Sequence, residues 1–108
     1  MVEYVFNLDS IFGSLADPTR RDILRRVSKE ELSVNEIAAP YKLSLAAVSK
    51  HLKILESARL IVKRRQGKQQ IVQVSPVAFK TAAEYLESYE ALWDKRFDVL
   101  EQLLIKEE

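Results

Sequence analysis

The spacing of apolar residues differs in one central stretch of this 108-residue chain, and that difference constrains its fold more than any other feature. On both sides of a central stretch, apolar residues recur every three or four positions, which is typical of helices. In between, residues 60–65 and 69–75 are rich in Ile and Val and flank Gln66-Gly67-Lys68. This pattern predicts a two-stranded hairpin that turns at Gly67, although Gln-Gly favours a tight turn less than Asn-Gly does.

Capping residues mark where the helices begin. Asp17 precedes Pro18, a pair that suits the cap and the first turn of a helix. Ser33 and Glu36 have the spacing of a capping box, and a proline four residues later ends that short helix. Similar signals and apolar stripes predict helices over about 8–15, 18–28, 34–39, 45–57 and 76–105. The predicted fold is mainly α with a small β-hairpin, in the order α-α-α-α-β-β-α, and it forms one winged helix-turn-helix domain over residues 1–108.

The predicted helix over 45–57 has two different sides. At about 100° per residue, Val48, Leu52 and Leu55 share one side, which is expected to be buried. The opposite side has small residues first and lysines beyond them, a composition that fits a DNA major groove better than an ordinary surface helix. We therefore predict DNA contacts from Ser44, Leu45, Ala46, Ala47, Ser49, Lys50, His51 and Lys53. His51 lies at the border of the apolar side and is expected to pack or to bind phosphate.

Basic residues are concentrated between Lys42 and Lys68. This stretch has eight lysines and arginines against one acid, Glu56, whereas the whole chain has a net charge of only +1. A basic block in an otherwise acidic chain is typical of nucleic-acid binding. The hairpin tip lies in this block, and we predict DNA contacts from Lys63, Arg64, Arg65, Gln66, Lys68 and Gln69. A hairpin edge kept soluble by charge would look similar, so that alternative stays open. Arg20 and Arg21, outside the block, are expected to be solvated or paired with acids.

The last predicted helix has more apolar surface than a domain of this size needs. Its apolar positions step by three or four and include Tyr89 and Trp93, residue types that are frequent at interfaces. We predict that it forms a homodimer with the help of the first helix, through Leu8, Ile11, Phe12, Leu15, Leu86, Tyr89, Trp93, Phe97, Leu100 and Leu104. Part of its length is also expected to pack on its own core.

The composition excludes several kinds of site. The chain has no cysteine, one histidine and two glycines, which excludes disulfides and thiolate metal sites and makes a glycine-rich cofactor loop improbable. We expect no enzyme activity, no catalytic residue, no cofactor and no bound metal. No apolar run approaches the ~20 residues of a membrane span, and acids near the N-terminus argue against a secretory signal. A cytoplasmic protein is therefore expected.

Two blocks of the sequence resemble the ArsR/SmtB family of winged-helix transcriptional repressors. Residues 15–24 read Leu-Ala-Asp-Pro-Thr-Arg-Arg-Asp-Ile-Leu, and residues 43–55 read Leu-Ser-Leu-Ala-Ala-Val-Ser-Lys-His-Leu-Lys-Ile-Leu. The hairpin segment 60–68 and the ending from Trp93 to Leu104 add to the resemblance. It implies a homodimer that binds palindromic operators and represses transcription, often of its own operon. By position it implies a recognition segment over Ser44–His51 and a wing tip over Arg64–Gln69.

The chain departs from the family pattern at two places that bear on function. Metal-sensing relatives often carry Cys-Val-Cys at the start of the third helix, where this chain has Ser33-Val34-Asn35, and others use histidine on the last helix, which has none here. Arg59 stands where a glycine is usual before the first hairpin strand, so the geometry of that turn is in question.

These observations predict a sequence-specific transcriptional regulator that binds double-stranded DNA. We expect a dimeric repressor of an inverted-repeat operator that does not respond to metals. A winged-helix module that binds protein or RNA is the alternative. No pocket for a small-molecule effector can be read from the sequence, so the effector is unknown, and control by the protein's own concentration is favoured.

Overall fold

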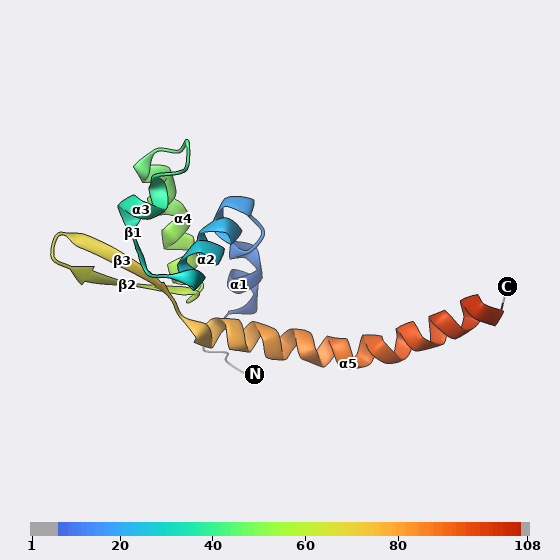
Figure 1. The fold of residues 1–108 in the computed structure, drawn as a ribbon. Helices are drawn as coiled ribbons and strands as arrows, with labels where there is room; N and C mark the ends of the chain where they lie inside the picture. Colours follow the sequence, from blue (N-terminus) through green and yellow to red (C-terminus); the bar gives the residue numbers. More distant parts are fainter. Residues whose placement is uncertain (1–6, 107–108) are drawn as a thin grey trace.

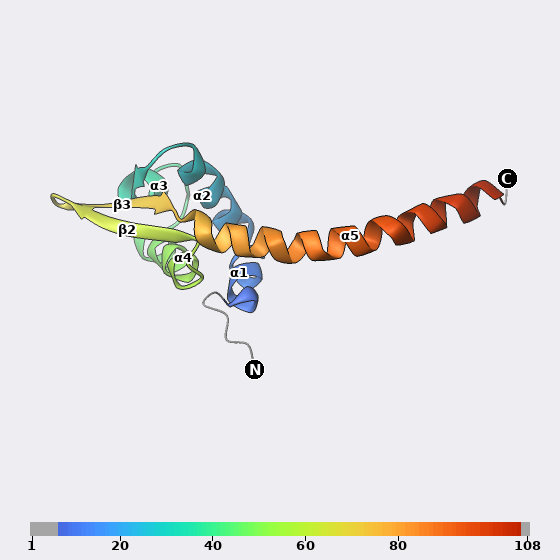
Figure 2. The ribbon, with the colours of Figure 1, turned by 90° about the horizontal axis from the view of Figure 1, so that it is seen from below.

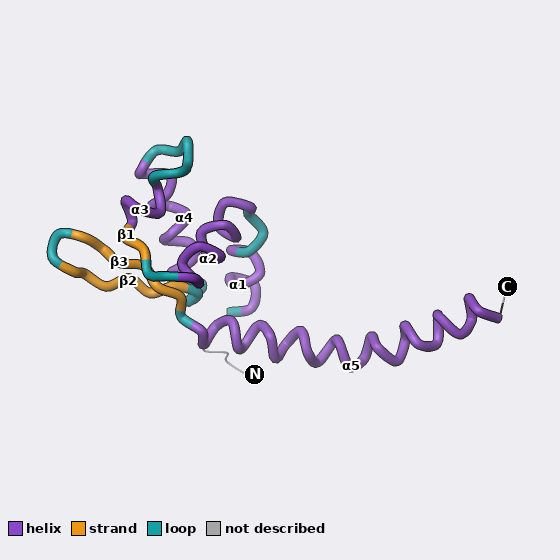
Figure 3. Tube along the Cα trace, viewed as in Figure 1, coloured by secondary structure: helices purple, strands orange, loops and turns teal. Residues whose placement is uncertain are grey.

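The computed structural model describes residues 7–106, which form five helices and three strands (Figure 1). The hairpin projects from one side of the helical body and the last helix extends from the other (Figure 3). A mainly helical winged fold with a long C-terminal helix is therefore confirmed. In chain order the elements are α1 (Leu8–Ser14), α2 (Pro18–Lys29), β1 (Leu32–Ser33), α3 (Val34–Ala38), α4 (Leu45–Ser57), β2 (Ile61–Gln66), β3 (Gln69–Val74) and α5 (Pro76–Lys106).

The helix starts follow the predicted capping residues. The Asp17 carboxylate accepts a hydrogen bond from the backbone N–H of Arg20 at 2.9 Å, and Pro18 opens α2. Ser33 and Glu36 form the full capping box, with the two reciprocal bonds at 3.1 and 2.9 Å. Because these bonds lie within four residues, they are readable from sequence alone.

The predicted two-stranded hairpin is confirmed as β2 and β3, and the described residues add a third strand, β1, that the sequence did not predict. The strand order is β1-β3-β2, and both pairs are antiparallel. β1 consists of Leu32 and Ser33 alone, opposite Val72 and Ile71 of β3. Two residues are too few to show an alternating pattern, and they are a strand only because β3 offers an edge to pair with. The hairpin turns at Gly67 as predicted, with a φ of 63° that favours glycine.

The core lies between the helices and the sheet. Val48, Leu52 and Leu55 of α4 have no exposed surface, as the two-sided pattern of this helix predicts. The cluster also contains Ile11, Ile23, Leu24, Val27, Leu32, Ile37, Ala58, Leu60, Ile61, Val72, Ala78 and Ala82. With one side of α4 held in this cluster, its opposite side faces away from the protein.

α5 contacts the body only at its start. Ala78 and Ala82 are buried, whereas Leu86 is already 54% exposed. From there the helix runs away from the body as a single projecting rod, and the molecule measures 64 × 37 × 21 Å (Figures 1 and 2). Within residues 7–106 no helix is both long enough and apolar enough to span a membrane.

The turn between α4 and β2 is the one in which Arg59 replaces a glycine. The N–H of Arg59 donates to the Glu56 carbonyl at 2.9 Å, and the N–H of Leu60 donates to the Leu55 carbonyl at 3.1 Å. This pair of bonds is a Schellman motif, which requires a left-handed residue, and Arg59 adopts a φ of 61°. The turn therefore keeps the geometry that suits glycine, at a strain cost of about 1–2 kcal/mol for a residue with a Cβ.

Candidate nucleic-acid interface

The outward side of α4 exposes most residues predicted to contact DNA. The N-cap Ser44 is exposed, and its hydroxyl oxygen accepts from the Ala47 N–H at 3.1 Å. Leu45 is 52% exposed. The predicted residues exposed on this side are Ser44, Leu45, Ala46, Ser49, Lys50 and Lys53, whereas Ala47 and His51 are half-buried. The exposed side of α4 thus carries small residues, Ala46 and Ser49, near the N-terminus and the cations Lys50 and Lys53 beyond them.

Lys50 and Lys53 have no acidic partner within residues 7–106. The ion pairs in that part of the chain involve Arg25, His51, Lys63 and Arg64 instead. Two exposed ammonium groups one turn apart on a helix raise the local positive potential, because nothing nearby neutralises them.

His51 is held in a polar cluster between α2 and α4. Its Nδ1 lies 3.2 Å from Arg20 Nη1 and 3.9 Å from an Asp17 carboxylate oxygen. A guanidinium only donates, so Nδ1 is the acceptor in this contact with Arg20. Arg20 also donates to the Ser14 carbonyl at 2.7 Å. Arg20 therefore binds inside the protein and braces His51, which corrects the expectation of a solvated arginine or one paired with an acid.

The cluster also affects Asp17. The backbone N–H of Arg20 is the largest cause that lowers the pKa of the Asp17 carboxyl. Desolvation acts against it, and the nearby charge of Arg20 lowers the pKa further. The carboxylate thus stays ionised beside His51 and Arg20. Through these contacts His51 of α4 is connected to Arg20 of α2 and to Asp17, the N-cap of α2.

α2 also holds the turn that precedes α4. Arg26 donates to the Ile37 and Glu36 carbonyls at 2.8 and 2.9 Å, and its guanidinium lies 5.3 Å from the centre of the Tyr41 ring. The Tyr41 hydroxyl donates to Asp22, and this bond is the first cause of the lowered pKa of the Asp22 carboxyl. The sequence did not reveal these contacts, which connect residues 10 to 19 positions apart.

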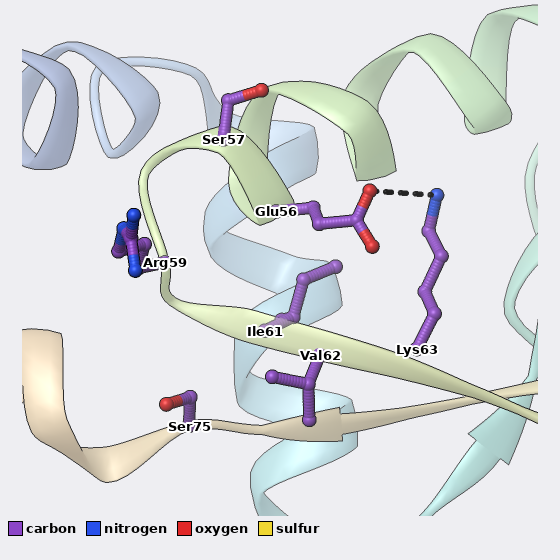
Figure 4. Close-up of a pocket in the computed structure, with 7 residues that line it drawn as sticks. All are labelled: Glu56, Ser57, Arg59, Ile61, Val62, Lys63 and Ser75. Carbon is purple, nitrogen blue, oxygen red and sulfur yellow. Dashed lines mark ion pairs between the residues drawn. The ribbon is translucent and has the colours of Figure 1, made fainter.

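The wing carries fewer free cations than the sequence indicates. Lys63 pairs with Glu56 at 3.6 Å, beside a surface hollow of about 450 Å³ at the base of the hairpin (Figure 4). Arg64 pairs with Glu31 of the loop before β1. Gln66, Lys68 and Gln69 are exposed, as is Arg65, whose Nε donates to the Gly67 carbonyl at 3.3 Å. Arg65 and Lys68 are the wing cations without an acidic partner in the described part of the chain.

The predicted dimer residues divide into two groups. Those on α5 are exposed: Leu86, Tyr89, Trp93, Phe97, Leu100 and Leu104 have between 45% and 67% of their surface open. In the N-terminal region, Leu8, Phe12 and Leu15 are partly buried against the core. Ile11 has no exposed surface and packs inside its own chain, so its assignment to the interface is wrong. On an amphipathic helix this short, the central apolar residue covers the core and its neighbours flank it.

The apolar surface of α5 is wider than predicted. Leu92, Val99 and Leu103 are 50–56% exposed and form a second row beside the predicted one. Trp93 stacks on Phe97 with ring centres 5.8 Å apart, and the Phe12 ring lies 5.9 Å from that of Tyr85. The steps of seven and four between Leu92, Val99 and Leu103 are the signal that would have revealed this row.

Within residues 7–106, no three His, Cys, Asp or Glu side chains are grouped so that they could hold a metal ion. The Ser33-Val34-Asn35 segment supplies hydroxyl and amide groups only, next to the capping box.

In this structure α3 and α4 are joined by a short turn, one side of α4 is exposed, and a basic hairpin, β2–β3, follows. This arrangement is typical of winged helix-turn-helix DNA-binding proteins. The comparisons with known proteins agree with this class. A family model described as a helix-turn-helix domain matches residues 15–64. The HTH-type transcriptional regulator Rv2034 of Mycobacterium tuberculosis is 33% identical over 99 residues, which cover 92% of this chain and 90% of that protein. The transcriptional repressor SdpR of Bacillus subtilis is 33% identical over 60 residues, which cover 56% of this chain and 67% of that protein.

Solved structures give the same result over most of the chain. An ArsR family transcriptional regulator, RHA00566, superposes with a TM-score of 0.78 at 33% identity and covers 87% of this chain and 97% of its own. The homodimeric winged helix-turn-helix domain of Mb0332 from Mycobacterium bovis gives a TM-score of 0.62 at 28% identity and covers 79% and 81%. The chain belongs to the ArsR/SmtB family of winged helix-turn-helix transcriptional regulators, as the two blocks in its sequence predict.

Proposed function

We propose that this protein is a homodimeric repressor that binds an inverted-repeat operator and does not respond to metals. The observation that carries the proposal is the exposed side of α4, where Lys50 and Lys53 keep an unpaired charge beside small residues. We further propose that residues 1–108 act as a single cytoplasmic domain.

The recognition step uses the N-terminal half of α4. Ala46 and Ala47 let the helix approach the base pairs, and alanine makes apolar contact with the thymine methyl group. Ser49 and Lys50 donate to base edges, while Lys53 binds phosphate. His51 directs its Nε2–H away from Arg20, which suits a phosphate oxygen at the groove margin.

The wing adds contacts that depend weakly on sequence. Arg65 and Lys68 at the hairpin tip bind the DNA backbone, and each phosphate neutralised releases a counterion. Lys63 and Arg64 contribute less because their charges are already balanced by Glu56 and Glu31. The wing cations that the structure leaves open are thus the two nearest the turn.

Assembly rests on the apolar side of α5. Trp93, Phe97 and Leu100 are about half exposed. A second copy of α5, with the partly buried Leu8 and Phe12 at the margin, supplies the missing cover. The similarity to the homodimeric domain of Mb0332 supports this arrangement. In such a dimer the two α4 helices enter successive major grooves ~34–36 Å apart.

The absence of cysteine from the sequence supports a regulator that does not sense soft metals. Zinc, cadmium or arsenite added to the operator complex at micromolar levels is expected to leave it intact. Release that a chelator or thiol reverses would contradict this part of the proposal.

The test is to select bound sequences from random DNA with the purified protein and to measure affinity at several salt concentrations. We expect nanomolar binding to an inverted repeat that weakens steeply with salt. Lys50→Ala is expected to weaken the free energy of DNA binding by about 1–3 kcal/mol and to relax the preference for particular bases, because it removes a base-edge contact. Arg65→Ala is expected to weaken binding to all sequences. It is also expected to reduce the slope of log binding constant against log salt concentration by about one. Binding that is indifferent to sequence would favour the protein- or RNA-binding alternative.

A further inference from the structure

A second hollow of about 450 Å³ lies between α1 and α4, on the side of α4 that carries its lysines. α1 packs against α4 at this point, and the two helices lie side by side in Figure 2. The lining comes from both helices and from the residue after α4: Ser10, Gly13, Ser14, Lys50, Lys53, Ile54, Ser57 and Ala58. A volume of this size is within the ~300–1,000 Å³ typical of small-molecule sites.

The floor of this hollow is mainly apolar. Ile54 is 37% exposed and Ala58 is buried beneath it. The Ser14 hydroxyl donates to the Ile11 carbonyl at 2.8 Å, so it is not available as a donor to a ligand. A Cβ built on Gly13 meets no atom within 4 Å, which shows that the space above α1 is open. The floor therefore favours an apolar body over a polar one.

The rim of the hollow is positively charged. Lys50 and Lys53 both line it, and neither has an acidic partner among residues 7–106. An apolar floor beside two unpaired ammonium groups matches a molecule with an apolar body and one anionic group. A carboxylate between the two lysines satisfies both charges while its hydrocarbon part covers Ile54.

We propose that the hollow between α1 and α4 binds a small amphipathic carboxylate, and that this ligand weakens DNA binding. The second half of the proposal rests on the proposed function, since Lys50 and Lys53 are the α4 cations assigned to DNA. The same ammonium groups cannot neutralise a ligand carboxylate and DNA at once. Ligand and DNA therefore compete.

The structure offers a variant that blocks the hollow and leaves the lysines in place. Gly13→Leu fills the open space above α1 with a side chain. Gly13 lies inside α1 without a positive φ, so leucine is tolerated there and favours the helix more than glycine does. Gly13→Ala is the matched control, because it raises helix propensity in the same way and leaves most of the space open.

The first measurement is calorimetric titration of octanoate into the full chain without DNA, at constant ionic strength. Octanol, which lacks the charge, and acetate, which lacks the chain, are the ligand controls. We expect octanoate to bind at least tenfold more tightly than either control. Gly13→Leu is expected to weaken octanoate binding at least tenfold, and Gly13→Ala less than threefold. Backbone amide NMR shifts are expected around Ser10–Ser14 and Lys50–Ala58.

Absence of octanoate binding overturns the proposal. So does an affinity that Gly13→Leu leaves unchanged, because octanoate then binds elsewhere, for example on the apolar side of α5. The second measurement is DNA affinity with and without octanoate, for the wild type and both Gly13 variants. Loss of DNA affinity in the wild type but not in Gly13→Leu supports competition, and unchanged DNA affinity in all three overturns it. If octanoate binds the hollow but no DNA sequence is preferred, the ligand site stands and the proposed function fails.

Discussion

The body of the molecule (residues 8–82) and its arm (residues 86–106) both carry many apolar side chains, yet they treat them differently. In the body, Leu52 and Ile23 have no exposed surface. In the arm, Trp93 is 47% exposed and Leu104 is 67% exposed. The body thus buries most of its large apolar residues within one chain, with Leu45 and Val62 among the exceptions, whereas the arm exposes them along a rod (Figure 1).

The contrast shows that apolar periodicity alone does not tell which chain covers a helix. An isolated helix is marginal in water, since most helix stability in proteins comes from packing of its apolar side. The helical structure of the arm is therefore expected to depend on dimer formation, whereas the fold of the body is expected to be independent of it. Four pairs of variants probe the two regions.

The largest expected effect is in the body core. Leu52→Ala removes a fully buried side chain and leaves a cavity, which is expected to lower the free energy of unfolding by about 3 kcal/mol. Urea unfolding at several protein concentrations measures it. The same change at Leu104 of the arm is expected to cost less than about 0.5 kcal/mol in dilute solution, because that side chain is exposed. Equal losses at the two positions would remove the distinction between body and arm.

The next effect is on assembly. Leu100→Glu places a charge in the middle of the apolar side of α5 and is expected to cost about 2 kcal/mol of association, a roughly 30-fold rise in the dimer dissociation constant. Analytical ultracentrifugation measures it, and the unfolding of the body is expected to stay unchanged. Gln102→Glu is the control, because it adds the same charge on the opposite side of the helix. A wild-type protein that is monomeric at tens of micromolar, by order of magnitude, would contradict the proposed dimer.

A smaller, pH-dependent effect is expected from Tyr41→Phe. The Tyr41 hydroxyl is the first cause that lowers the pKa of the Asp22 carboxyl below its ordinary value of 3.8. A lowered folded-state pKa stabilises the protein above the unfolded pKa, and that stability is lost as pH falls through the folded value. The variant is therefore expected to cost about 1 kcal/mol at pH 7 and less below pH ~4. Thermal unfolding across pH measures the difference, and Tyr89→Phe in the arm is expected to show no such trend.

The smallest expected effect is at the turn after α4. Arg59→Gly and Arg59→Ala both remove the arginine side chain, but only glycine relieves the positive φ of 61°. The glycine variant is therefore expected to be more stable than the alanine variant by about 1 kcal/mol. Chemical denaturation of the two variants measures this difference. Equal stabilities would mean that the turn has no strain to relieve.

The features that local sequence determines were predictable. Asp17, Ser33 and Ser44 mark their helices through bonds to residues three positions away, and Gly67 marks the hairpin turn. β1 was not predictable, because two residues become a strand only when another strand lies beside them. The same holds for Ile11: its helix was predicted, but burial within its own chain depends on how α1 docks.

The candidate interface shows the same limit. Which side of α4 faces outward follows from its periodicity, so the exposed lysines were predictable. The pairing of Arg64 with Glu31, 33 residues away, was not, and neither was the contact of Arg20 with His51 across 31 residues. These long-range contacts decide which of the many cations remain open to a ligand.

The way α5 joins the body has a mechanical consequence. Ala78 and Ala82, two of the smallest side chains, are its only fully buried contacts among the residues described, and the helix continues for about 36 Å beyond them at 1.5 Å per residue. Such a helix acts as a lever whose pivot is the short segment around Ala78 and Ala82, where Phe79 and Tyr85 also contact the body. A tilt of about 5° at the pivot displaces its far end by about 3 Å. In the proposed dimer, where two such helices pack on each other, small repacking at the pivot is expected to change the distance between the two α4 helices. Larger side chains at Ala78 or Ala82 are thus expected to alter the spacing between the proposed half-sites, at positions outside the proposed DNA contacts and the proposed dimer surface.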